Sequence, residues 1–163
     1  MKKFTTCLWF DGNAEEASEF YISIFKNSKI TGITRYSHAG SEASGQKEGT
    51  VMTVTFQLDG HEFMALNGGP EFKFSEAVSF IVNCEDQEEI DYYWGKLSEG
   101  GDEKAQVCGW LKDKFGLSWQ IVPSVLGEML QDKDTEKSER VVSELMKMKK
   151  LNIETLKQAY AEE

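Results

Sequence analysis

The sequence predicts an α+β fold in which two βαβββ modules follow one another and a C-terminal helical extension completes the chain. Two observations lead to this prediction. Residues 4–25 align with residues 77–98 at an offset of 77 − 4 = 73 residues, and each copy is an apolar strand, a polar turn and an amphipathic helix. Strand-like segments follow both helices. A chain of 163 residues that is 40% hydrophobic can bury the core that this fold requires.

The strand-to-helix turn of each copy carries the same cap pattern. Asn13 and Asp86 stand where a helix would begin, and Glu16 and Glu89 follow three residues later. This is the spacing of a capping box, in which two side chains satisfy free amides at the helix start. The following apolar residues recur every three or four positions and predict one buried stripe on each helix. These residues are Ala17, Phe20, Tyr21 and Ile24 in the first copy, and Ile90, Tyr93, Trp94 and Leu97 in the second.

The first module, about residues 1–70, continues with three predicted strands. They span residues 29–36, 50–58 and 61–67, and the last two are joined by Asp59-Gly60, a two-residue hairpin turn. The polar segment from residue 38 to residue 49 is rich in glycine and serine and predicts a mobile loop.

The second module, about residues 75–123, shows a less regular pattern after its helix. Strands are predicted over residues 104–111 and 117–122, and a further strand is expected around residues 101–107. Together the modules make a paired domain over residues 1–123.

The C-terminal extension, residues 124–163, is predicted to be helical. Its segments are 124–131, 134–149 and a last helix capped by Asn152. One face of these helices is apolar, so we expect the extension to pack on the domain or on a second subunit.

Composition excludes several classes of partner. A net charge of −10 argues against binding to nucleic acid or to an anionic membrane. No apolar run reaches the length of a membrane span, and the N-terminus does not resemble a signal peptide. Cys7, Cys84 and Cys108 are odd in number and far apart, which favours a reduced, cytoplasmic protein.

Four segments resemble the PhnB-like family: residues 7–25, 74–101, 108–123 and 140–156. This family is often labelled "3-demethylubiquinone-9 3-methyltransferase domain" and is part of the vicinal-oxygen-chelate superfamily, with the glyoxalases, bleomycin-resistance proteins and dioxygenases. The resemblance implies that the sheets curve into a cup and that the protein is a homodimer. It does not name a reaction, since the superfamily includes lyases, epimerases and antibiotic-binding proteins. A methyltransferase activity is disfavoured because the sequence contains no GxGxG turn.

The superfamily usually holds a divalent metal ion in the cup, on the first and last strand of each module. The repeat places Thr6, Ser79 and Gln120 at three of these positions, and the fourth lies near Ala65–Asn67. Hydroxyl and amide groups are weak ligands compared with histidine and carboxylate. We therefore expect no metal and no cofactor.

The same reasoning selects the residues that would line the cup. Side chains alternate along a strand, so Thr6 with Leu8, and Ser79 with Ile81, should face the cup. Trp9 and Trp119 should then face the helices, whereas Trp110 is a cup candidate. The candidate ligand-binding residues are Thr6, Leu8, Asn67, Ser79, Trp110 and Gln120.

The leading functional hypothesis is a PhnB-like protein that binds a small organic molecule in its cup without the usual metal. One alternative is an enzyme of the same superfamily that uses another ion or acid–base set. A second alternative is an interaction protein whose cup is vestigial. An open cup with convergent polar groups would favour the first two, and a closed apolar one the third.

Overall fold

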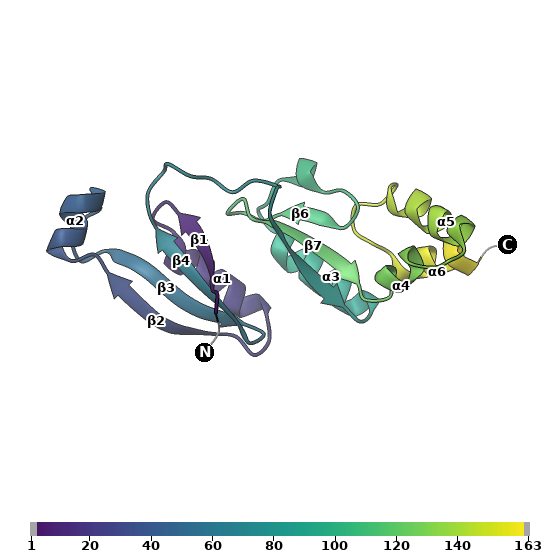
Figure 1. Ribbon diagram of the computed structural model, residues 1–163, viewed down its shortest axis with the longest axis horizontal. Coiled ribbons are helices and arrows are strands. Elements are labelled where there is room, and N and C mark those ends of the chain that lie inside the picture. The colour runs from purple at the N-terminus through teal and green to yellow at the C-terminus, as the bar shows by residue number, and fades with distance from the viewer. Residues whose placement is uncertain (1–2, 162–163) are drawn as a thin grey trace. The chain divides into compact units, whose positions relative to one another are not determined.

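The computed structural model describes residues 3–161, and the chain divides into two compact units between Phe74 and Ser75. Each unit has its own sheet and its own core, which confirms the predicted α+β fold with two modules (Figure 1). None of the helices within the described residues combines the length and the apolar character that a membrane span needs.

The first unit is a four-stranded sheet in the order β1-β4-β3-β2. Strands β1 and β4 are parallel and the other pairs are antiparallel. Helix α1 packs on one face of this sheet, where the Tyr21 ring stacks on Phe56 with 6.4 Å between ring centroids. The elements are β1 (Thr6–Phe10), α1 (Ala14–Ile24), β2 (Lys29–Arg35), α2 (His38–Ser44), β3 (Val51–Leu58) and β4 (His61–Asn67).

The prediction of a loop from residue 38 to residue 49 is wrong over its first half, because helix α2 forms there. Ser37 caps this helix by accepting a hydrogen bond from the Gly40 amide, and Gly45 ends it in the left-handed conformation at φ 73°. Both are ordinary helix-boundary signals, which the high glycine and serine content concealed.

The second unit has a three-stranded sheet in the order β5-β7-β6. Strands β5 and β7 are parallel and β6 is antiparallel to β7, so the sheet reproduces β1-β4-β3 without a counterpart of β2. Its elements are β5 (Ser79–Cys84), α3 (Gln87–Ser98), a 3₁₀ turn η1 (Glu103–Ala105), β6 (Trp110–Lys112) and β7 (Ser118–Pro123), followed by α4 (Leu126–Leu130), α5 (Thr135–Leu145) and α6 (Ile153–Ala161).

The strands predicted over residues 101–107 and 104–111 are therefore wrong, apart from the short β6. Asp102 caps η1 by accepting a hydrogen bond from the Lys104 amide, which bends the chain. Cys108 and Gly109 then form a tight turn, with φ values of 50° and 84°. This turn brings Val107 back onto Trp110, so no long strand can form.

The two strand-to-helix turns differ in how they satisfy the first helical amides. Asp86 accepts a hydrogen bond from the Glu89 amide at 2.9 Å, as predicted, although the Glu89 carboxylate binds the Glu85 amide rather than the Asp86 amide. Asn13 makes no side-chain cap, so the capping box predicted in the first module is wrong. There the Asn67 side chain accepts a hydrogen bond from the Ala14 amide at 2.9 Å.

The C-terminal extension packs within the second unit. A core cluster joins α4, α5 and α6 to the segment that precedes α6; its buried members are Leu126, Met129, Val141, Leu151 and Leu156. Asp134 caps α5, and Asn152 accepts a hydrogen bond from the Thr155 amide at 2.8 Å at the start of α6. The predicted cap residue Asn152 is therefore confirmed.

Candidate functional site

The open face of the second sheet brings together three of the predicted site residues. On β5, Phe80, Val82 and Cys84 point toward the side that α3 covers, whereas Ser79 and Ile81 lie on the opposite side. The fully buried Ile90 and Leu97 of α3 close the covered side. The open face consequently consists of alternate residues of three strands.

Ser79 and Gln120 form a polar pair on this open face. The Gln120 amide nitrogen donates a hydrogen bond to the Ser79 hydroxyl oxygen at 2.9 Å. Within the described residues Gln120 makes no other side-chain hydrogen bond, and no buried side-chain polar atom lacks a partner. The Gln120 carbonyl oxygen is therefore accessible to solvent, and the Ser79 hydroxyl keeps its proton free to donate. The pair offers one acceptor and one donor to a ligand.

Apolar side chains flank this polar pair. Strand register aligns Ile81 with Gln120, and Gln120 with Trp110, so these three residues form one row across the sheet. The Ile81 side chain is exposed and Trp110 is half-buried. An aromatic face, an amide and an aliphatic group thus stand side by side, as in many sites for small organic molecules.

The neighbouring row of the sheet contributes a charge. It runs from Ser79 through Ser118 to Lys112, and the Lys112 ammonium is paired with the Glu76 carboxylate. This hydrogen bond lowers the pKa of Glu76 below its ordinary value. Glu76 lies outside every strand and shows no local pattern, so its role at the open face has no signal in the sequence.

The first sheet places its predicted residues on the opposite side, against α1. Thr6 pairs with Phe63, and Leu8 with Ala65, so both belong to the helix-facing side. Leu8 is part of the core, with 6% of its surface exposed. The expectation that Thr6 and Leu8 occupy positions equivalent to Ser79 and Ile81 is wrong.

The expectation that Trp9 faces the helix is wrong for the same reason. Trp9 lies on the open side of the first sheet, where its indole N–H donates to the Gly69 carbonyl at 2.8 Å and its ring meets Phe72 edge-on. Trp119, in contrast, is buried on the helix side as predicted, and donates to Asp113 at 2.8 Å.

The cause is a one-residue difference between the two strand-to-helix turns. Two residues, Asp11 and Gly12, separate β1 from the cap position, whereas Glu85 alone separates β5 from Asp86. The helices match at an offset of 73, but the strand ends Phe10 and Cys84 match at 84 − 10 = 74. A shift of one residue moves every strand side chain to the other face.

Asn67 has a structural role in the first unit. It is buried, its side-chain oxygen caps Ala14, and its side-chain nitrogen donates to the Val51 carbonyl at 3.1 Å. The Tyr36 hydroxyl donates to the Asn67 backbone carbonyl. Both ends of the Asn67 amide are therefore engaged inside the unit.

The donor set does not suit the divalent metal ion that the superfamily implies. By the corrected register, the positions equivalent to Ser79 and Gln120 in the first unit are Thr5 and Met64. A hydroxyl and a thioether in the first unit, and a hydroxyl and an amide in the second, do not resemble the histidine and carboxylate groups that hold such ions. Among the described residues, no group of three or more histidine, cysteine or acidic side chains is arranged to hold a metal.

Cys84 does not supply a nucleophile to the open face of the second sheet. Cys84 is buried on the helix side, where desolvation, helped by the charges of Glu89 and Asp86, raises its pKa to about 12. A thiol with such a pKa stays protonated at neutral pH.

Comparisons with known proteins agree with this architecture. The family model for 3-demethylubiquinone-9 3-methyltransferase matches residues 2–122. The solved structure of a PhnB protein from Bacillus cereus is 41% identical, with a TM-score of 0.65, over 76% of this chain and 100% of that chain. A search of curated proteins gave no match.

Two more distant structures share the fold. A protein from Pseudomonas aeruginosa is 18% identical, with a TM-score of 0.57, over 76% of this chain and 98% of that chain. The fosfomycin resistance protein FosX from Mesorhizobium loti is 12% identical, with a TM-score of 0.54, over 81% of this chain and 100% of that chain. The family match and the Bacillus cereus structure show that this chain belongs to the PhnB-like family described as 3-demethylubiquinone-9 3-methyltransferase.

Proposed function

We propose that this protein binds a small organic molecule on the open face of its second sheet, without a metal ion. The observation that carries the proposal is the polar pair of Ser79 and Gln120, in which Gln120 lies between Trp110 and Ile81 in one row of the sheet. An unpaired donor and acceptor beside an aromatic ring favour a ligand that is planar and hydrogen-bonding.

The charges nearby favour a neutral or anionic ligand. Lys112 is the cation nearest the polar pair in strand register, and its charge is balanced by Glu76. A neutral ligand leaves this ion pair intact, whereas a carboxylate ligand would compete with Glu76 for Lys112. A primary amide matches the polar pair directly, because it accepts from the Ser79 hydroxyl and donates to the Gln120 carbonyl oxygen.

The family description does not by itself assign a methyl-transfer reaction to this chain. Binding of a nucleotide-like methyl donor commonly uses a glycine-rich turn between a strand and a helix. Here the two strand-to-helix turns are Asp11-Gly12-Asn13 and Glu85-Asp86. The proposal is therefore restricted to binding.

Native mass spectrometry of protein purified without chelator tests the proposal. We expect a retained organic molecule and no stoichiometric transition metal, and we expect Gln120→Ala to lose the retained molecule. Gln57→Ala is the matched control, since Gln57 is a half-buried glutamine on the open side of the first sheet. Stoichiometric zinc, nickel or manganese that Gln120→Ala removes would contradict the proposal, as would equal retention in both variants.

We also propose a homodimer, because the family resemblance implies paired modules. Part of the apolar face of the extension, including Val141 and Leu145, packs within the second unit, while Val142 and Met146 stay exposed. Light scattering should give twice the mass of the chain at micromolar concentration. A monomer at high micromolar concentration would remove the dimer without affecting the ligand proposal.

A further inference from the structure

The C-terminal extension contacts the part of the second unit that presents Trp110. The family model ends at residue 122, so helices α4, α5 and α6 lie outside it. The segment between α5 and α6 that matters here is Met148–Leu151, which we name the clamp segment.

The clamp segment binds the turn that precedes β6. Cys108 and Gly109 form the two central residues of this turn, and Val107 and Trp110 exchange backbone hydrogen bonds across it. The amides at the tip of such a turn have no partner within the hairpin itself. Here the Cys108 amide donates to the Met148 carbonyl at 2.8 Å, and the Gly109 amide donates to the Lys149 carbonyl at 2.8 Å.

Side-chain packing also holds the Cys108–Gly109 turn in place. Leu151 is fully buried, and a Cβ atom added to Gly109 would lie 3.1 Å from its side chain. On its other side, the Gly109 carbonyl accepts a hydrogen bond from the Ile121 amide at 2.8 Å. The turn is thus fixed between β7 and the clamp segment.

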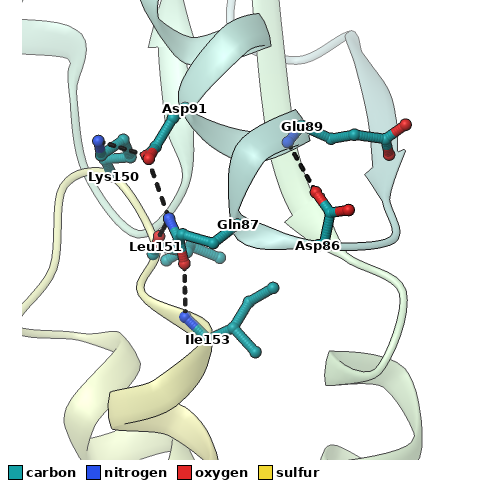
Figure 2. Close-up of polar contacts among 7 residues, drawn as sticks. All are labelled: Asp86, Gln87, Glu89, Asp91, Lys150, Leu151 and Ile153. Atoms are coloured by element: carbon teal, nitrogen blue, oxygen red, sulfur yellow. Dashed lines mark hydrogen bonds and ion pairs between the residues drawn. The ribbon is translucent and has the colours of Figure 1, made fainter.

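Gln87, the first residue of α3, fixes the clamp segment in turn (Figure 2). Its side-chain nitrogen donates to the Leu151 carbonyl at 3.1 Å, and its side-chain oxygen accepts from the Ile153 amide at 2.9 Å. Lys150 pairs with Asp91 one turn further along α3, which lowers the pKa of Asp91. Both ends of the Gln87 amide therefore hold the segment in one register.

We propose that the clamp segment is a positioning element for the ligand site: it holds the Cys108–Gly109 turn so that Trp110 lies beside Gln120. Gly109 and Trp110 are consecutive, and Trp110 occupies the same row as Gln120, so displacement of the turn displaces the aromatic side of the site. The inference rests on the proposed function for its ligand. The position of Trp110 can be measured in the protein without any ligand.

The test uses the full chain labelled with 5-fluorotryptophan. Its four tryptophans give four fluorine signals, and Trp110→Phe identifies the one from Trp110. In Gln87→Leu we expect the Trp110 signal to shift or broaden, while the signals of Trp9 and Trp119 stay in place and show that the fold is intact. Gln158→Leu is the control, because Gln158 is exposed on α6 and, within the described part of the chain, its side chain bonds only Glu154.

Measuring the affinity of the same variants for benzamide distinguishes a failure of this inference from a failure of the proposed function. Loss of two hydrogen bonds that order the turn should weaken benzamide binding roughly tenfold in Gln87→Leu and leave it unchanged in Gln158→Leu. An unmoved Trp110 signal in both Gln87→Leu and the isosteric Gln87→Glu would overturn the inference, as would equal benzamide affinity in wild type and Gln87→Leu. If benzamide fails to bind the wild type, that result counts against the proposed ligand site, and the Trp110 signal alone decides the inference.

Discussion

The two modules use different residues for the same task at the turn from strand to helix. In the second module, Asp86 caps α3 from the adjacent position in the chain, at 2.9 Å from the Glu89 amide. In the first module, Asn67 reaches α1 from the end of β4, 53 residues further along the chain. A local cap can be recognised in a sequence, whereas a cap supplied by a distant strand cannot.

The modules also differ in the elements that accompany the three strands they share. The first has β2 as its fourth strand, whereas the second has a bent segment with η1 and gains the C-terminal extension. The difference shows that one repeat can support two kinds of surface. The open side of the first sheet has Trp9 covered by Gly69 and Phe72, and the open side of the second presents the polar pair of Ser79 and Gln120.

The largest effect on stability should come from Asp113, in the hairpin between β6 and β7. Its buried carboxylate accepts hydrogen bonds from the Phe115 and Leu117 amides and from the Trp119 indole. Asp113→Ala removes these three buried hydrogen bonds and should cost roughly 4 kcal/mol of unfolding free energy. Urea denaturation measures the loss. Asp102→Ala, which removes an exposed cap, is the control, and an equal loss in both variants would contradict this role.

The next effect should come from Asn67 in the first module. Asn67→Ala removes the cap on Ala14 and the bond to Val51, both of them buried, and should cost about 3 kcal/mol. Asn83→Ala is the matched control because Asn83 is exposed on β5, and its effect should stay within about 0.5 kcal/mol. A small loss for Asn67→Ala in urea denaturation would show that Asn13 or water takes over the cap.

Asp86→Ala compares the stability contributed by the local cap of α3 with that contributed by the distant Asn67 cap of α1. Removal of an exposed N-cap side chain should cost about 1 kcal/mol, clearly less than Asn67→Ala. Asp86→Asn keeps an acceptor at this position and should restore most of the loss. If Asp86→Ala proves as costly as Asn67→Ala, the distinction between a local exposed cap and a distant buried one fails.

The smallest effect on stability should come from Cys84, which ends β5 at the position where Phe10 ends β1. Its folded-state pKa of about 12 lies above the ordinary value of 9.0, so the protonated thiol is favoured by folding. The associated stability is complete below pH 9 and is lost as the pH rises toward 12; between pH 8 and pH 9.5 the loss is below about 1 kcal/mol. Stability curves of wild type and Cys84→Ala should converge over this range. Parallel curves would contradict the assignment.

The fold could be predicted from the sequence wherever one local rule decided the outcome. The two strand–helix units, the hairpin at Asp59-Gly60 and the cap Asn152 all follow such rules. The sequence did not indicate that the strand expected before β6 would be absent from the second module. The tight turn that replaces it places Cys108 in the left-handed conformation, where cysteine is an unusual residue.

The site could be predicted in one module and not in the other. Ser79 and Gln120 share the open face of the second sheet, as the alternation of side chains indicated, and the cup candidate Trp110 lies on the same face. Thr6 and Leu8 lie on the helix side because the turn after β1 is one residue longer, and Gly12 adopts a φ of 85° there. Residues 4–25 and 77–98 are aligned without a gap, and the match is set by the two helices. Such an alignment does not show that the turn after β1 is one residue longer.

The most direct test of the proposed ligand site is a titration of ¹⁵N-labelled protein with benzamide, followed through its side-chain N–H signals. We expect the Gln120 amide and Trp110 indole signals to shift together, while those of Gln57 and Trp9 in the first unit stay in place. Cyclohexanecarboxamide, which has the same amide but no planar ring, should bind more weakly. Shifts of Gln57 and Trp9 instead, or the absence of any shift at millimolar benzamide, would contradict the assignment of the site to the second sheet.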